Sequence, residues 1–398
     1  MSLNFSTGLP RLLMALATVA MLGLSPAQAA VPQAPTLDAK AYLLVDVTTG
    51  QILAQDNSQM PVEPASLTKL MTAYVVFDAL KAKKINLDQT FTVSERAWRM
   101  EGSRMFIEPN MAIPVRDLLH GMIVQSGNDA TVALAEGVAG SVERFVDMMN
   151  QQAALLGMKN TAYKNPEGLT AAGHTTTAQD LALLSTRLMN DFPAYTPIYA
   201  TKHYRYPGTP AANDTNRNLL LFRDPTVDGL KTGHTEAAGY CLVATAIRPV
   251  PPRGVEGLRT RRLLSVILGA SSATSRATES QKLLNWGYSN FELVTVAKAD
   301  AALTTVRVWK GQTKMAALGV KGGLAVTVPT GSSDKVELKV NVSERLIAPL
   351  AAGQVVGDVS VSLPGGVVLT KQPLVAVEAV PADGFLGRMW DTLLLLSE

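Results

Sequence analysis

The chain has 398 residues, with 36 basic and 33 acidic side chains and a net charge of +3. This near balance excludes an argument for nucleic-acid binding from overall charge. With 47% hydrophobic and 17% charged residues, it is the sequence of a folded protein of about two domains. The single cysteine, Cys241, excludes an intrachain disulfide and a cysteine-rich metal site. No HExxH, GxGxxG or GxxxxGK[ST] pattern occurs, which argues against zinc proteases, dinucleotide-binding enzymes and P-loop enzymes.

The N-terminal segment predicts export from the cytoplasm. An apolar run, residues 12–24, follows Arg11 and ends in Ala27-Gln28-Ala29, which matches an A-x-A cleavage site. Because the run is too short to cross a bilayer, we interpret residues 1–29 as a signal peptide rather than a membrane anchor. Without disulfides, the stability of the exported protein must come from packing.

The first large part of the chain mixes strands and helices. Pro64 precedes a helical run, residues 65–80, that is apolar almost all round and is therefore expected to be buried. Thr176 and Gln179 form a capping-box pattern before a later helix. The remaining expected elements, in chain order, are strands at 41–47 and 51–55, helices at 115–124, 130–138, 142–156 and 178–189, strands at 227–230, 241–247 and 263–268, and a helix at 277–286.

The sequence pattern changes after Phe291. Alternating and β-branched segments, separated by Gly, Ser and Pro, predict strands at 305–309, 324–328, 336–342 and 355–363, and hence a small all-β domain. Residues 385–396 are helical again, with apolar side chains on one half of the helix and polar ones on the other. We therefore expect an α+β fold in four segments: the signal peptide, a mixed domain at 30–290, the β domain at 291–382 and an amphipathic helix at 383–398.

The first chemical motif is Ser-x-x-Lys at Ser66 and Lys69, where the buried helix begins. Residues three apart lie on one face of a helix, so the two side chains can meet. A serine hydroxyl needs an adjacent base to act as a nucleophile, and a lysine can be that base only if its pKa is lowered. Burial and the positive end of the helix both lower it. The same pattern at Ser332 and Lys335 lies in a Gly/Ser-rich stretch of the β domain, and we interpret it as a solvated turn.

Two further motifs follow in the mixed domain. The Ser-Gly-Asn tripeptide that begins at Ser126 lies in a short loop between two predicted helices, where its polar groups can face a cleft. The Lys-Thr-Gly tripeptide that begins at Lys231 follows the strand at 227–230 and occurs once in the chain. Each tripeptide alone is common, but the ordered set of all three motifs is far more specific.

With these motifs the sequence resembles the penicillin-recognising serine acyltransferases. Among them it is most similar to the low-molecular-mass penicillin-binding proteins that are D-alanyl-D-alanine carboxypeptidases. The similarity covers nearly the whole mature chain and includes residues 165–169 (NPEGL), 216–218 (NRN) and 234–240 (HTEAAGY). The resemblance implies a β-lactamase/transpeptidase-like domain, in which helices flank an antiparallel sheet, followed by the small all-β domain and the tail helix.

The resemblance also implies roles for the motif residues. Ser66 would be the acylated nucleophile and Lys69 its general base. Ser126, hydrogen-bonded between Lys69 and Lys231, would relay the proton to the leaving amine, and Lys231 would set the positive field of the site. Asn128 would hold a substrate amide.

Substrate binding is expected beside the strand that carries Lys231, which would pair with the extended peptide. The backbone N–H groups of Ser66 and His234 would form the oxyanion hole. The terminal carboxylate would be bound by Arg217, Thr232 and His234, with Gly233 also among the substrate-binding residues.

The expected function is that of a serine D-Ala-D-Ala carboxypeptidase, which removes the terminal D-alanine from peptidoglycan stem pentapeptides through an acyl-enzyme on Ser66. The resemblance implies no cofactor, no metal site, no nucleic-acid partner, and inhibition by β-lactams. The amphipathic tail predicts a periplasmic protein attached peripherally to the outer face of the cytoplasmic membrane.

Four alternatives differ in sequence features. A peptidoglycan endopeptidase of the same superfamily usually lacks the β domain. A class A β-lactamase needs a deacylating glutamate in an ExxLN pattern, which the chain does not contain. A non-catalytic wall-binding scaffold would be expected to have lost Ser66 or Lys69, and a Ser-His-Asp hydrolase would carry a GxSxG elbow, which is absent. We interpret His174 and Cys241 as structural, and the five arginines between 248 and 262 as part of a solvated hairpin.

Overall fold

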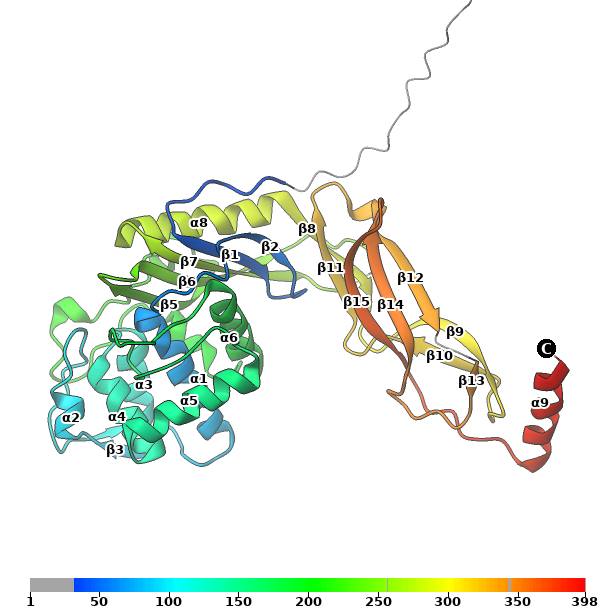
Figure 1. Cartoon of the computed structure of the whole chain (residues 1–398), viewed down its shortest axis with the longest axis horizontal. Helices are drawn as coiled ribbons and strands as arrows, with labels where there is room; N and C mark the ends of the chain where they lie inside the picture. Colours follow the sequence, from blue (N-terminus) through cyan, green and yellow to red (C-terminus); the bar gives the residue numbers. More distant parts are fainter. Residues whose placement is uncertain (1–31, 256, 343–344, 398) are drawn as a thin grey trace, which may run out of the picture.

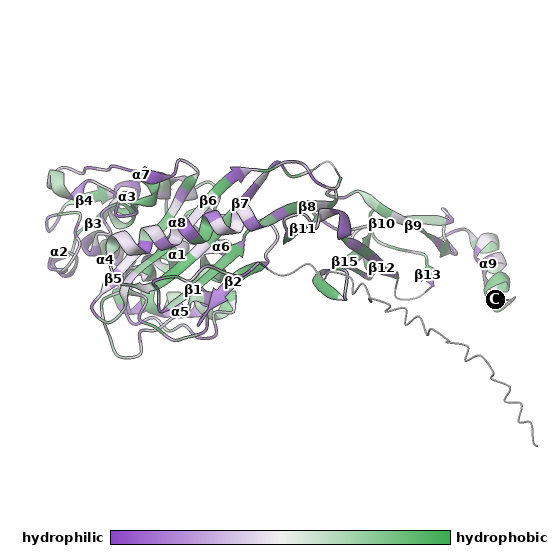
Figure 2. Cartoon of the chain, turned by 90° about the horizontal axis from the view of Figure 1, so that it is seen from above, coloured by the Kyte–Doolittle hydropathy of each residue, from purple (hydrophilic) through white to green (hydrophobic). Residues whose placement is uncertain are grey.

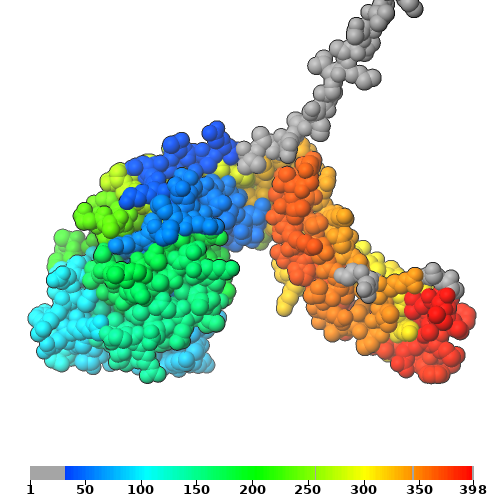
Figure 3. All heavy atoms as spheres, viewed as in Figure 1, coloured from blue at the N-terminus to red at the C-terminus, as the bar shows by residue number. Residues whose placement is uncertain are grey.

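The computed structural model describes residues 32–255, 257–342 and 345–397, so the predicted signal peptide at 1–29 lies outside the described residues. Figure 1 shows a mixed domain of helices and strands, an all-β domain beside it and a tail helix at the far end of the second domain. Figure 3 shows that the two domains meet at one end and diverge from there.

A five-stranded antiparallel sheet forms the centre of the mixed domain, with the strand order β2-β1-β7-β6-β5. The inner strands read as almost continuous apolar runs because both faces of the sheet are covered (Figure 2). Among the described strands β5 pairs with β6 alone, so its outer edge has no strand partner. The five strands are β1 (Ala41–Asp46), β2 (Ile52–Asp56), β5 (Val227–Thr235), β6 (Gly239–Pro249) and β7 (Thr260–Ala270).

Helices cover the two faces of this sheet (Figure 1). Helix α8 (Ala273–Asn290) packs on one face, and α6 (Ala178–Asp191) packs against β1 and β7 on the other. Helix α1 (Lys69–Lys81) contacts α3, α4, α5 and α6, which agrees with its apolar sequence. The other elements of this domain are α2 (Glu95–Trp98), α3 (Val115–Ile123), α4 (Asn128–Ala139), α5 (Val142–Leu156), α7 (Leu220–Arg223), the small hairpin β3 (Thr90–Thr92) and β4 (Ala112–Pro114), and the 3₁₀ turns η1 (Ala65–Thr68), η2 (Thr196–Ala200) and η3 (Ala211–Asn213).

The predicted capping box at the start of α6 was wrong by one residue. Thr177 is the N-cap, and its side chain accepts a hydrogen bond from the Asp180 backbone N–H. The backbone of Thr176 instead forms an antiparallel bridge with Val62, and its hydroxyl contacts that of Thr161 at 2.9 Å. Because Thr176 pairs with Val62, the neighbouring Thr177 caps the helix in its place.

The second domain is built from strands around a Val- and Leu-rich core. Its main sheet has the order β12-β14-β15-β10-β9-β13, and β8 pairs with β11 as a separate antiparallel pair of strands. Sequence patterns predicted four of these strands and missed the others. The strands are β8 (Phe291–Ala297), β9 (Ala302–Trp309), β10 (Met315–Gly319), β11 (Leu324–Pro329), β12 (Glu337–Val342), β13 (Leu346–Ile347), β14 (Val355–Leu363) and β15 (Val367–Ala376), with the 3₁₀ turn η4 (Ser333–Lys335) between β11 and β12.

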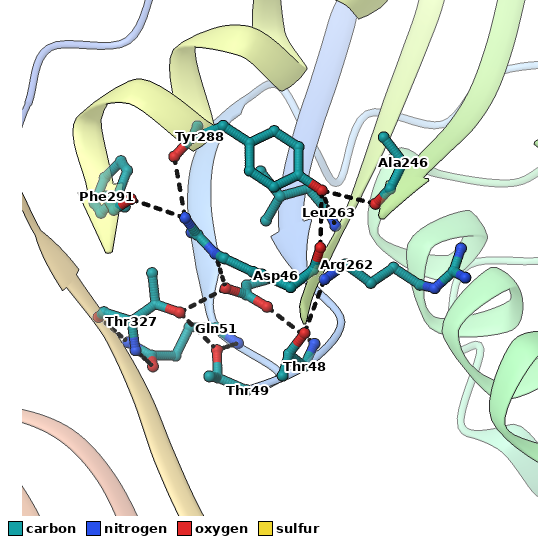
Figure 4. Close-up of polar contacts among 12 residues, drawn as sticks. Asp46, Thr48, Thr49, Gln51, Ala246, Arg262, Leu263, Tyr288, Phe291 and Thr327 are labelled. Atoms are coloured by element: carbon teal, nitrogen blue, oxygen red, sulfur yellow. Dashed lines mark hydrogen bonds and ion pairs between the residues drawn. The ribbon is translucent and has the colours of Figure 1, made fainter. Parts of the chain in front are cut away.

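A buried polar network joins the two domains (Figure 4). The Asp46 carboxylate accepts hydrogen bonds from Arg261 Nε and from the Thr327 hydroxyl of the β domain, both at 2.6 Å. Gln51 and Thr327 exchange two further bonds, from Gln51 Nε2 to the Thr327 carbonyl and from the Thr327 N–H to Gln51 Oε1. Arg261 and Asp46 are almost fully buried, so the interpretation of this arginine as part of a solvated hairpin was wrong.

The tail helix α9 (Phe385–Ser397) touches the β domain through its polar side. Asp391 is buried, and its carboxylate accepts hydrogen bonds from the Lys310 backbone N–H and from Lys314 Nζ. The exposed apolar side chains of the helix are Phe385, Leu386, Met389, Trp390, Leu393 and Leu396. Within the described part of the chain, no helix has the length and apolar character needed to cross a membrane.

Candidate active site

Ser66 lies on η1, the tight turn that leads directly into α1. The three-residue spacing places Lys69 beside it, and Lys69 Nζ donates a hydrogen bond to Ser66 Oγ at 2.9 Å. Gly168, with a φ of +91°, packs against this turn so closely that a Cβ there would meet the Ala65 carbonyl oxygen at 1.9 Å. The turn and the loop at 165–169 therefore hold each other in place, and no larger residue fits at 168.

Lys69 is 1% exposed and donates to three oxygens. Besides Ser66 Oγ, these are Asn128 Oδ1 at 2.8 Å and the Glu167 main-chain oxygen at 2.6 Å. Burial lowers the pKa of Lys69 to about 7, while Glu167 opposes this shift, Arg217 adds to it and Asp129 opposes it. A lysine whose pKa lies near neutrality can accept a proton from a neighbouring hydroxyl.

Ser126 lies between α3 and α4 with a φ of +62°, a conformation that serine rarely adopts. Lys231 Nζ donates to Ser126 Oγ at 2.9 Å and to the Thr232 carbonyl at 3.0 Å. Burial lowers the pKa of Lys231 well below its ordinary value, and the positive charges of Lys69, Arg217 and Arg276 act in the same direction. The Lys-Thr-Gly motif belongs to β5 itself rather than following a shorter strand.

The structure connects Asn128 and Ser126 to the lysines differently from the expected scheme. Ser126 is hydrogen-bonded to Lys231, but in the described residues no hydrogen bond joins it to Lys69. Lys69 is bonded to Asn128 instead, and Asn128 Nδ2 donates to the Glu101 carbonyl at 2.6 Å. Asn128 is 4% exposed, so in this structure its amide links Lys69 to the segment around 101.

A cleft of about 570 Å³ opens above these groups. Six of the nine predicted site residues line it, and Lys69, Lys231 and Asn128 are buried behind its wall. The six are Ser66, Ser126, Arg217, Thr232, Gly233 and His234. In the described chain no group of three or more His, Cys, Asp or Glu side chains has an arrangement that could hold a metal ion.

Arg217 supplies a positive charge at the surface of the cleft. The asparagines on either side of it bond to fixed backbone groups, Asn216 Nδ2 to the Thr201 carbonyl and Asn218 Nδ2 to the Gly229 carbonyl of β5. Arg217 itself is exposed, donates no hydrogen bond to a described residue and has its pKa lowered by partial desolvation. A guanidinium with free donors in a cleft is suited to bind a carboxylate.

Sequence reasoning missed Arg276 of α8, which lines the same cleft. Its Nη1 donates to the Gly233 carbonyl at 3.0 Å, and its guanidinium lies 5.6 Å from the centre of the Tyr240 ring. Burial lowers the pKa of Arg276 to about 10. His234 stacks on the same Tyr240 ring at 4.0 Å between ring centres. In the sequence, Arg276 resembles any other polar residue of a helix, and only the packing of α8 on β6 and β7 brings it to the cleft.

Two other residues, His174 and Cys241, have the structural positions that the sequence suggested. His174 Nε2 is 2.9 Å from the Thr68 hydroxyl beneath the nucleophile turn, and burial lowers the pKa of its imidazole to about 4. Cys241 is a buried free thiol whose pKa is raised by burial. Ser332 precedes the short turn η4 of the β domain, so the prediction of a turn is confirmed, but Ser332 is 3% exposed and its interpretation as solvated was wrong. The residues after Ser332 form only this short turn, whereas those after Ser66 lead into the buried helix α1.

The fold and the site define an active-serine enzyme of the penicillin-recognising class, in which a buried lysine is hydrogen-bonded to the serine. The profile of the D-alanyl-D-alanine carboxypeptidase family matches residues 28–272, and that of the penicillin-binding protein 5 C-terminal domain matches residues 291–382. The chain belongs to this carboxypeptidase family, and it is a serine-type D-Ala-D-Ala carboxypeptidase.

Individual relatives agree over most of the chain. The D-alanyl-D-alanine carboxypeptidase DacC of Escherichia coli is 42% identical over 91% of this chain and 89% of its own length. The crystal structure of penicillin-binding protein 5 from Haemophilus influenzae superposes with a TM-score of 0.80 at 37% identity and covers 88% of this chain and 99% of its own. By contrast, a D-alanyl-D-alanine endopeptidase of Pseudomonas aeruginosa is 32% identical over 55% of this chain and 70% of its own length.

Proposed function

We propose that the enzyme removes the terminal D-alanine from peptidoglycan stem pentapeptides through an acyl-enzyme on Ser66. The observation that carries this proposal is the 2.9 Å contact between Ser66 Oγ and a buried lysine, at the floor of a cationic cleft. A serine beside a lysine that titrates near neutrality is an activated nucleophile.

In the acylation step, neutral Lys69 accepts the Ser66 proton while Ser66 Oγ attacks the carbonyl carbon of the penultimate D-alanine. The backbone N–H groups of Ser66 and His234 stabilise the resulting oxyanion. Collapse of this intermediate breaks the peptide bond. Ser126, held by Lys231, gives its hydroxyl proton to the leaving D-alanine amine and takes up the proton that Lys69 accepted from Ser66, which requires Ser126 to approach Lys69 when substrate is bound. Lys69, neutral again, then accepts a proton from the water that attacks the ester, and this proton returns to Ser66 Oγ as the ester bond breaks. Asn128 would hold a substrate amide only if binding releases one of its two present hydrogen bonds.

Substrate orientation follows from the edge position of β5. Its unpaired edge borders the cleft and can add an extended peptide as a further strand. The free carboxylate would then lie beyond the scissile bond, near Arg217, Thr232 and His234. Gly233, which also lines the cleft, lets β5 pack closely on η1, because a Cβ there would meet Leu67 and the Pro64 carbonyl oxygen at 3.2 Å. β-Lactams carry an equivalent carboxylate and an acylating carbonyl, so they are expected to acylate Ser66 and block the enzyme.

The decisive experiment incubates the purified protein with a stem pentapeptide and, separately, with penicillin, and analyses both by mass spectrometry. We expect loss of one D-alanine from the peptide and a covalent penicillin adduct on Ser66. Ser66→Ala should abolish both, whereas Ser332→Ala, the second match to the motif, should keep both. An undiminished adduct in the Ser66→Ala protein would refute the assignment of the nucleophile.

We also propose that the chain divides into a signal peptide at 1–29, a catalytic domain at 30–290, a β domain at 291–382 and a membrane-associating helix at 383–398. Figure 2 supports the last part, since α9 carries both polar and apolar residues. Its buried Asp391 ties the polar side to the β domain, and its apolar side chains face outward. Such a helix can lie in the membrane interface. The protein would then be periplasmic and attached peripherally to the outer face of the cytoplasmic membrane.

A further inference from the structure

One buried acid next to Lys69 has no place in the mechanism above. Glu167 is 6% exposed, and its Oε2 is buried without a hydrogen-bond partner among the described residues. Leaving such a group unpartnered is costly, because a buried carboxylate loses its hydration without compensation. In the sequence, residues 165–169 were only part of the family resemblance. The position of the Glu167 carboxyl beside Lys69 is known only from the fold.

Glu167 cannot easily move away from Lys69. Thr72, one turn after Lys69 on α1, donates its hydroxyl proton to the Pro166 carbonyl at 2.6 Å. Asn165 Oδ1 accepts from the Gly168 N–H at 2.7 Å, which closes the loop on itself. The main-chain oxygen of Glu167 accepts the 2.6 Å bond from Lys69 Nζ. The loop is therefore fixed to α1 at the lysine and at the next turn.

Without Glu167, the positive and negative charges around Lys69 would not be balanced. Arg217 beside the cleft is positive and disfavours an ammonium at 69. Asp129 of α4 is negative, but its carboxylate accepts hydrogen bonds from the backbone N–H groups of Met105, Phe106 and Ala130. Arg96 of α2 acts on Glu167 from farther away and is paired with Glu143. The Glu167 carboxylate is hydrogen-bonded to its own backbone N–H, but its Oε2 has no partner among the described residues, so Glu167 is less compensated by hydrogen bonds than Asp129.

We propose that Glu167 is a positioning residue of the reaction, because its main-chain oxygen holds the Lys69 amine beside Ser66 and its buried carboxylate supplies the negative charge that keeps this amine sufficiently basic. This inference rests on the proposed role of Lys69 as the general base. A base works best when it titrates near the working pH. Burial and Arg217 would together make the amine too weak a base, and Glu167 opposes them. Burial raises the pKa of Glu167 as well, and the Lys69 charge opposes that shift, so the two groups titrate together.

The test is the pH profile of penicillin acylation between about pH 5 and pH 9, measured as a second-order rate constant. In Glu167→Gln the lysine loses the carboxylate that favours its charged form. The acid limb of the profile should therefore move to lower pH by on the order of one unit. A shift of this size is at the lower end of the pKa shifts that a nearby opposite charge causes. Because the amine becomes a weaker base, the plateau should fall by about threefold.

Two further variants make this result specific. Glu167→Asp keeps the charge but draws it back from Lys69, so its acid limb should lie between those of the unmutated enzyme and Glu167→Gln. Glu63→Gln is the matched control, because Glu63 is a partly buried glutamate near the cleft whose carboxylate accepts from the Thr170 hydroxyl instead of acting on Lys69. Its acid limb should coincide with that of the unmutated enzyme.

The outcomes separate this inference from the proposed mechanism. If Lys69→Ala is still acylated at the normal rate, the role of Lys69 as base is wrong. If Lys69→Ala is inactive but Glu167→Gln keeps the unmutated acid limb, only the role of Glu167 is refuted. Thermal unfolding shows whether each variant is folded. If Glu167→Gln does not fold, the test rests on Glu167→Asp. An acid limb of Glu167→Asp that coincides with that of the unmutated enzyme then refutes the proposal.

Discussion

Replacing Arg217 by alanine tests how the enzyme recognises the C-terminal carboxylate of its substrate. The guanidinium has no hydrogen bond to a described residue, so its removal should change the free energy of unfolding by less than about 0.5 kcal/mol. Removing one partner of an interfacial charge pair costs about 2–5 kcal/mol, and the exposed position of Arg217 puts the expected loss at about 2–3 kcal/mol. At 1.4 kcal/mol per factor of ten, kcat/KM on a pentapeptide should fall by roughly 30- to 150-fold.

A substrate with an amidated C-terminus provides the second half of this experiment. The unmutated enzyme should lose a similar factor on the amide, and Arg217→Ala should lose little more, because the two changes remove the same interaction. Arg223→Ala is the control, since Arg223 is an exposed arginine on nearby α7 that lies outside the lining of the cleft. If Arg217→Ala discriminates between acid and amide as strongly as the unmutated enzyme, Arg217 does not bind the carboxylate.

Asp46→Ala should lower the free energy of unfolding by about 3–5 kcal/mol in urea titrations, because it leaves the buried Arg261 charge uncompensated; a loss under about 1 kcal/mol would contradict this. Thr327→Val removes one hydrogen bond between the domains and should cost only about 1 kcal/mol. Since burial lowers the pKa of His174 to about 4, the folded state resists its protonation, and stability should fall by about 3 kcal/mol between pH 6.5 and pH 4; His174→Gln should lack this part of the pH dependence. A chain that ends before Asp383 should be active and released from membranes, and finding the full-length mature protein already soluble in cells would exclude attachment through α9.

Local signals in the sequence located most helices of the mixed domain. Helix α5 runs from Val142 to Leu156 as predicted, because Ser141 caps its first turn and Gly157 ends it with a φ of +83°. The strands of the β domain were harder to find. Strand β10 reads as Met-Ala-Ala-Leu-Gly, which favours a helix, and β15 contains Pro373, which usually excludes a strand. Their pairing with β9 and β14 overrides these local preferences.

The sequence by itself determined the chemistry of this enzyme. A serine and a lysine three residues apart must share a helix face, so Ser66 and Lys69 meet wherever the helix forms. The order of the three motifs was specific enough to identify the family before any geometry was known, and six of the nine predicted residues line one cleft.

Only the tertiary structure decided the electrostatic surroundings of that pair. Glu167 and Asn128 accept hydrogen bonds from Lys69, and Arg276 acts on Lys231 through its charge, across about 40 to 100 residues of sequence. Such contacts have no periodicity or spacing that a sequence can display, because they arise from how separate elements pack. The pKa of a buried group depends on all the charges that this packing brings near it, so a motif predicts the nucleophile but not the strength of its proposed base.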